Sequence, residues 1–196
     1  MREIGRLVLV LTAICFVAAL ALSQVYELTK EPIAYQKRLE VLKAIRAVLR
    51  DIDNEPDKDA VHLSMGLQTH EEPGEVTFFR GRLNNELTGV AFVVQSREGY
   101  GGTIEIMLGV DLEGRILGVE ILSHLETPGL GSKITKESFR QQFAGRSLRD
   151  TKWAVTKDGG DIAQITGATI SPRAVVKAVH EGLRIYKQNQ ERIFEG

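Results

Sequence analysis

Two short stretches of this chain combine hydroxyl or carboxyl side chains with small residues that let a ligand approach the backbone. The first is Thr166-Gly167-Ala168-Thr169, and the second runs from Glu126 to Gly131 as Glu-Thr-Pro-Gly-Leu-Gly. Glycine and alanine leave room for a bulky group beside the main chain. Each pattern alone is also compatible with an ordinary connection, because small-residue turns before helices and Pro-Gly turns are common.

A helix is predicted to follow the first stretch directly, from Ser171 to about Gln190. Ser171 is a favoured N-cap, and Pro172 suits the first helical position. Apolar residues then recur at helical spacing, at Val175, Val179, Leu183 and Tyr186. Thr169 would present its hydroxyl just outside the helix N-terminus, where N–H groups and the helix dipole stabilise a phosphate. Arg173, in the first turn, is placed to add a charge-assisted hydrogen bond. The alternative is a capped turn with nothing bound.

The stretch from Thr166 to Thr169 resembles the Ser/Thr-Gly-Ala-Thr flavinylation motif of the FMN-binding domain family. In that family the last threonine carries FMN through a phosphoester bond, so the resemblance implies covalent FMN on Thr169. The neighbouring residues implied to contact the cofactor are Thr166, Gly167, Ala168, Ser171 and Arg173. The family usually has an aspartate three residues before this motif. Here that position is Ala163, and the nearest acid is Asp161, which predicts less efficient modification.

The second stretch matches the other hallmark of the same family, a Glu-Thr-Pro-Gly-Leu-Gly loop that lies against the flavin. A third stretch, Gly99 to Gly102, resembles a Gly-Tyr-x-Gly loop of the same site in Rnf G subunits. The resemblance therefore adds Glu126, Thr127, Pro128, Gly129, Leu130, Gly131, Tyr100, Gly101 and Gly102 to the predicted FMN site. Two hallmarks in the expected order are far more specific than either one.

The resemblance covers essentially the whole chain and is strongest to G subunits of the Rnf electron-transport complex. It implies an electron-relay subunit of a membrane complex that couples electron flow between ferredoxin and NAD to ion translocation. Its implied partners are the other subunits, membrane lipid and a flavin transferase that attaches the FMN. Two alternatives stay open. One is the C subunit of a sodium-translocating NADH:quinone reductase, and the other is a membrane-anchored binding or assembly module without a redox role.

Composition argues against several other classes of protein. A formal net charge of −1 over 196 residues gives no support for nucleic-acid binding. The single cysteine, Cys15, excludes an intrachain disulfide and a Cys-only metal site. His62 and His70 lack the spacing and the carboxylate neighbours of a metal site, so we interpret them as surface residues. No Gly-rich dinucleotide fingerprint follows a predicted strand. We therefore predict no metal site, no catalytic side chain and no self-sufficient dehydrogenase.

The N-terminal segment is predicted to anchor these residues to a membrane. Leu7 to Tyr26 carries no formal charge, and about 20 helical residues span a bilayer core. Arg2 and Arg6 precede it, so the positive-inside rule places the N-terminus in the cytoplasm. We expect a single pass through the inner membrane with the main domain on the periplasmic side. The alternative is a signal peptide cleaved near residues 19–21.

The remaining pattern predicts an α+β fold, with an antiparallel sheet packed by helices. Predicted strands cover 76–79, 87–95, 103–110, 116–122 and 153–156, with turns at 71–74, 111–114 and 157–161 and a short helix at 133–143. Residues 27–52 read as helix, either a solvated stalk or a helix packed on the domain. The predicted divisions are 1–26 for the tip and membrane helix, 27–58 for a helical linker and 59–196 for the FMN-binding domain.

Overall fold

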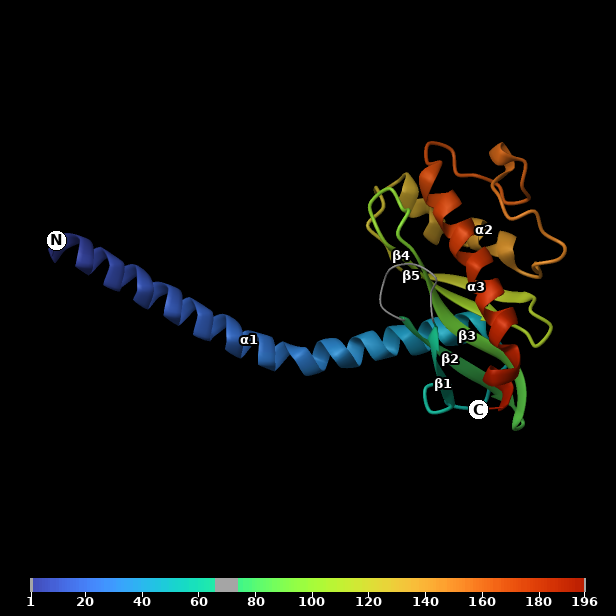
Figure 1. The fold of residues 1–196 in the computed structure, drawn as a ribbon, viewed down its shortest axis with the longest axis horizontal. Coiled ribbons are helices and arrows are strands. Elements are labelled where there is room, and N and C mark those ends of the chain that lie inside the picture. The colour runs from blue at the N-terminus through green and yellow to red at the C-terminus, as the bar shows by residue number, and fades with distance from the viewer. Residues whose placement is uncertain (1, 66–73, 196) are drawn as a thin grey trace. The chain divides into compact units, whose positions relative to one another are not determined.

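The computed structural model describes residues 2–65 and 74–195 (Figure 1). His70 and residues 71–73 of the turn predicted at 71–74 lie outside the described residues. The chain divides into two compact units, Met1–Glu40 and Val41–Gly196. Helix α1 (Arg2–Val48) contributes to both of them.

The first unit is helical from Arg2 to Glu40. Its apolar side chains are exposed, and α1 is the one helix within the described residues that is long and apolar enough to cross a membrane. The helix continues through Pro32, so this proline does not begin a new helix. Just before it, the Thr29 hydroxyl donates to the Val25 carbonyl at 2.8 Å. By length and composition, α1 therefore supports the predicted membrane anchor.

The second unit is built on a five-stranded antiparallel sheet with the strand order β1-β2-β3-β4-β5. The strands are β1 (Ala60–Met65), β2 (Gly74–Leu83), β3 (Glu86–Ser96), β4 (Ile104–Val110) and β5 (Ile116–Ser123). Asn84 and Asn85 join β2 to β3 with φ values of 52° and 70°. Two positive φ values are typical of a type I′ hairpin turn, which asparagine tolerates. The predicted antiparallel α+β fold is confirmed.

Both faces of the sheet are covered. Helix α3 (Ile170–Glu195) packs on one face, where its apolar stripe meets buried side chains that include Phe92, Ile106 and Leu108. Gly182 allows the close approach, because a Cβ there would lie 2.5 Å from Val94 Cγ1. The end of α1 packs on the other face through Ala44, Ile45 and Val48, together with Leu49 just after it, against Ala91 and Met107. Residues 27–52 were predicted to form either a solvated stalk or a helix packed on the domain. Residues 41–49 are packed on the domain.

Strand β1 was not predicted because little of it is buried. Leu63 is the buried apolar side chain that the described part of this edge strand contributes to the core. His62 is an exposed residue as expected, and its Nδ1 lies 3.0 Å from Thr77 Oγ1 on β2. Polar contacts hold this edge, since Asp59 accepts hydrogen bonds from Arg80 and Arg82 on β2. Desolvation raises the pKa of Asp59, but the two arginines outweigh it and lower that pKa.

Two predicted elements differ in detail from the structure. The helix expected at 133–143 is three short pieces: the 3₁₀ helix η1 (Gly131–Thr135), α2 (Glu137–Arg140) and the 3₁₀ helix η2 (Gln141–Phe143). Ile134, Phe139 and Phe143 from these pieces are buried. The strand expected at 153–156 is reduced to one bridge between Val155 and Ile162, followed by η3 (Thr156–Asp158). Apolar residues of both segments lie in the core, but a short apolar run does not determine whether the backbone forms a helix or a strand.

Candidate cofactor site

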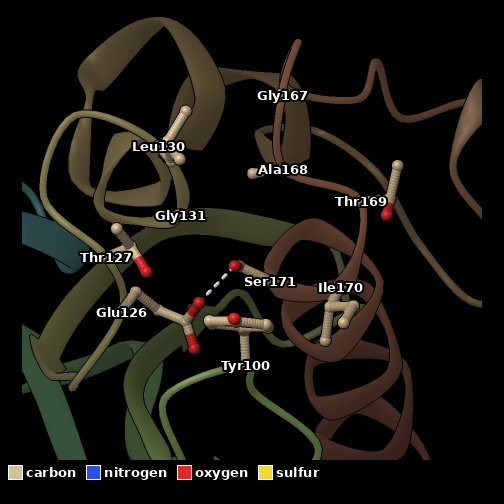
Figure 2. Close-up of a pocket in the computed structure, with 10 residues that line it drawn as sticks. All are labelled: Tyr100, Glu126, Thr127, Leu130, Gly131, Gly167, Ala168, Thr169, Ile170 and Ser171. Carbon is tan, nitrogen blue, oxygen red and sulfur yellow. Dashed lines mark hydrogen bonds between the residues drawn. The ribbon is translucent and has the colours of Figure 1, made fainter.

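A cavity of about 370 Å³ opens where three loops meet in the second unit (Figure 2). One loop joins β3 to β4, one follows β5, and the third leads into α3. The residues that line the cavity are Tyr100, Glu126, Thr127, Leu130, Gly131, Gly167, Ala168, Thr169, Ile170 and Ser171. The fold thus brings all three predicted stretches together, although they are separated by up to 70 positions in the chain.

The small-residue motif forms a tight turn against the second motif. The Ala168 N–H donates to the Ile165 carbonyl at 3.0 Å, and Gly167 has a φ of 83°. Such a value at the third turn position favours glycine, as in type II turns. A Cβ on Gly167 would lie 3.1 Å from Leu130 Cδ2, so the leucine of one motif lies directly on the glycine of the other.

Helix α3 begins one residue earlier than predicted, at Ile170. Thr169 therefore occupies the position immediately before the first helical residue, and its side chain is exposed. The predicted N-cap role of Ser171 was wrong, because its hydroxyl is buried and donates to Glu126 Oε2. Pro172 is accommodated at the third helical position, since the first N–H groups of a helix have no intrahelical acceptor.

The Glu126 side chain joins its own loop to the Tyr100 loop and to the first turn of α3. It is only 4% exposed, and its Oε1 accepts the Gly101 N–H at 3.1 Å while Oε2 accepts the Ser171 hydroxyl. Figure 2 shows the carboxylate and this hydroxyl pointing toward each other. The backbone N–H of Glu126 in turn donates to His124 Nδ1 at 3.1 Å, which gives His124 a local structural role.

The rest of the Glu-Thr-Pro-Gly-Leu-Gly stretch is a hydrogen-bonded turn, as predicted. The Leu130 N–H donates to the Thr127 carbonyl at 3.2 Å, and Gly129 has a φ of 74°. Proline at the second position and a left-handed glycine at the third match a type II turn. The Gly129 N–H also donates to Ser132 Oγ at 2.9 Å. This turn directs Thr127 and Leu130 to the cavity and leaves Pro128 and Gly129 off its lining.

Arg173 is engaged with a neighbouring loop. Its Nε and Nη2 donate to the two carboxylate oxygens of Asp158, each at 2.6 Å. The hydrogen bond from Arg173 lowers the pKa of Asp158, and the same bond raises the pKa of Arg173. The pair joins the loop before the small-residue motif to the first turn of α3. The third guanidinium nitrogen of Arg173, Nη1, takes no part in this ion pair.

Six predicted site residues do not line the cavity: Thr166, Arg173, Pro128, Gly129, Gly101 and Gly102. The lining includes one residue that was not predicted, Ile170. Its position directly after the threonine motif was the available signal. Ile170, Leu130 and Tyr100 have exposed fractions of 43%, 44% and 70%, so apolar surface borders the cavity.

The position three residues before the small-residue motif is exposed. Ala163 lies there, and its N–H donates to Gln142 Oε1 at 2.6 Å. The nearest acid, Asp161, accepts the Lys152 N–H at 2.7 Å and lies 3.9 Å from Arg146 Nη1. Asp161 therefore has a structural role in this loop.

Comparison with known proteins identifies the domain that contains this cavity. The model of the FMN-binding domain family matches residues 99–184, which include all three loops. A G subunit of an ion-translocating oxidoreductase complex from Aliivibrio fischeri is 40% identical over 194 residues, covering 95% of this chain and 91% of the relative. The chain belongs to this family of G subunits. The predicted family is thereby confirmed.

Other G subunits give the same result. The one from Cereibacter sphaeroides is 37% identical over 192 residues, covering 94% of this chain and 85% of the relative. The one from Stutzerimonas stutzeri is 41% identical over 177 residues, covering 87% and 75%. These matches favour the G-subunit prediction over the quinone-reductase alternative.

Two solved structures share the fold. The NqrC protein from Shewanella oneidensis aligns with a TM-score of 0.55 and 18% identity, covering 74% of this chain and 76% of that one. Its counterpart in the Na⁺-translocating NADH-quinone reductase of Parabacteroides distasonis aligns with a TM-score of 0.57 and 20% identity, covering 80% and 95%. At these identities the likeness concerns the fold alone.

Proposed function

We propose that this G-subunit family member carries FMN covalently on Thr169 and relays electrons between partner subunits of a membrane ion-translocating complex. The observation that carries the proposal is the position of Thr169. Its exposed side chain lies on the cavity wall, directly before the first residue of α3. A phosphodiester at this point is stabilised by the helix dipole, by about 0.3–1 kcal/mol.

The residues around the cavity fit FMN. A volume of about 370 Å³ falls within the usual range of ligand pockets. Leu130, Ile170 and the Tyr100 ring supply apolar surface for a planar ring system, and Thr127 supplies a hydroxyl. The Nη1 group of Arg173 is available to a phosphate while Asp158 holds the rest of the guanidinium. Bound FMN supplies one- and two-electron exchange, and the protein holds and tunes it.

Attachment is tested directly by producing the protein with and without a flavin transferase. With the transferase, the band should fluoresce on a denaturing gel, and mass spectrometry of peptides across residues 158–173 should place one FMN on Thr169. Without the transferase, the band should be dark. A protein that stays dark in both hosts, while a known flavinylated control fluoresces, would contradict the proposal.

The orientation follows from Arg2 and Arg6, which precede the apolar part of α1. Positive charges near a membrane helix favour the cytoplasmic side, so we propose a periplasmic second unit. Protease added to sealed right-side-out vesicles should digest residues 41–196, and inverted vesicles should protect them. Digestion only in inverted vesicles would reverse the topology.

A further inference from the structure

The cavity wall contains a carboxyl group that is held by the protein itself. Glu126 is 4% exposed and Ser171 is 1% exposed. Both oxygens of Glu126 accept hydrogen bonds, one from the Gly101 N–H and one from the Ser171 hydroxyl. Both partners donate to it, and a carboxylate is an acceptor-only group. Because both of its oxygens contact protein groups, Glu126 supports the walls of the cavity.

The surrounding backbone leaves room for this carboxylate. A Cβ on Gly99 would lie 2.6 Å from Glu126 Oε1, and a Cβ on Gly131 would lie 2.5 Å from Oε2. The same Cβ on Gly131 would lie 2.5 Å from Ser171 Oγ. Glycines on two of the loops therefore permit the carboxylate to be buried where the three loops meet.

We propose that Glu126 is a positioning residue that joins its own loop to the Tyr100 loop and to the first turn of α3. It also fixes a negative charge at the wall of the FMN cavity, which lowers the reduction potential of the flavin. This inference rests on the proposed function, because it requires FMN in the cavity. A nearby negative charge disfavours the addition of electrons, and burial reduces solvent screening of that charge. Fixed charges beside a flavin are one of the ways in which a protein tunes it.

Substituting Glu126→Gln separates the charge from the hydrogen bonds. The amide oxygen can accept the Gly101 N–H, and the amide nitrogen can donate to Ser171, whose hydroxyl can also accept. The loops should stay joined while the negative charge is lost. Glu98→Gln is the matched control, because Glu98 lies beside the same Tyr100 loop but its side chain is 61% exposed and pairs with Lys177.

The readout is a spectroelectrochemical titration of the flavinylated full-length proteins. At the wild-type midpoint potential, Glu126→Gln should raise the ratio of reduced to oxidised flavin about tenfold, or about 30 mV for a two-electron couple. Glu98→Gln should match wild type. Both variants should unfold near the wild-type temperature, whereas Glu126→Ala should unfold about 5 °C lower and carry less flavin.

An unchanged potential in flavinylated Glu126→Gln would overturn the proposed charge effect. Loss of folding or of flavin in Glu126→Gln would also overturn the proposal, because the amide preserves both hydrogen bonds and the volume. Normal stability and normal flavin content in Glu126→Ala would overturn the joining role. Absence of flavin from wild type and Glu98→Gln would instead contradict the proposed function, so the two failures are distinguishable.

Discussion

Thr169→Ala is expected to remove all covalently bound flavin while the domain stays folded. The threonine side chain is exposed, so its loss leaves no buried cavity and no unpaired buried group. Surface substitutions of this kind usually change the free energy of unfolding by no more than about 0.5 kcal/mol. The hydroxyl itself is the proposed attachment atom, so flavin fluorescence of the denatured band should fall to that of unmodified protein.

Thr166→Ala is the matched control for this experiment. Thr166 is also exposed and also belongs to the small-residue motif, but it does not line the cavity. Its variant should retain flavin on Thr169. Ser171→Ala is a second comparison, because this hydroxyl is buried and donates to Glu126. Flavin that remains covalently bound in Thr169→Ala would place the bond elsewhere, and peptide mass spectrometry would identify the residue.

The sequence anticipated the family, the fold class and the three loops of the site, because those features depend on local patterns. Short motifs with glycine and proline indicate turns whatever lies around them, and the alternating apolar residues of 104–108 indicate a strand. The helical stripe from Val175 to Tyr186 likewise predicted the face of α3 that packs on the sheet.

The parts that were missed depend on tertiary contacts. Ser171 has the residue type of an N-cap, but a buried carboxylate 45 positions earlier takes its hydroxyl. Strand β1 forms because its backbone pairs with β2 and because Asp59, just before it, accepts hydrogen bonds from Arg80 and Arg82. Neither arrangement is visible from neighbours in sequence, since the partners meet only after the sheet and loops have assembled.

The role of Gly101 also depends on a contact with a residue that is distant in the sequence. The resemblance placed it in the predicted FMN site, but it does not line the cavity. A Cβ at this position would lie 1.8 Å from the Leu125 carbonyl oxygen and 2.4 Å from the carbonyl carbon. Glycine is therefore required because two backbone segments pack against each other here, beside the N–H that donates to Glu126.

Gly101→Ala is accordingly expected to destabilise the domain by about 3 kcal/mol, at the upper end of the usual cost of overpacking. The clash involves main-chain atoms, which cannot rotate away as a side-chain end can. The Tyr100 loop must move, which breaks the hydrogen bond to Glu126 and separates two walls of the cavity. Urea unfolding of the full chain in detergent should show the loss, and flavin attachment by the transferase should fall with it.

Gly129→Asn is the matched control for Gly101→Ala, since Gly129 also lies in a loop of the site. A Cβ on Gly129 would meet nothing within 4 Å, and its φ of 74° is one that asparagine tolerates. This variant should lose no more than about 1 kcal/mol and should keep its flavin. If Gly101→Ala were as stable as Gly129→Asn, the backbone contact with Leu125 would not explain the glycine. If Gly101→Ala lost flavin without losing stability, the glycine would serve the ligand, as the resemblance implied.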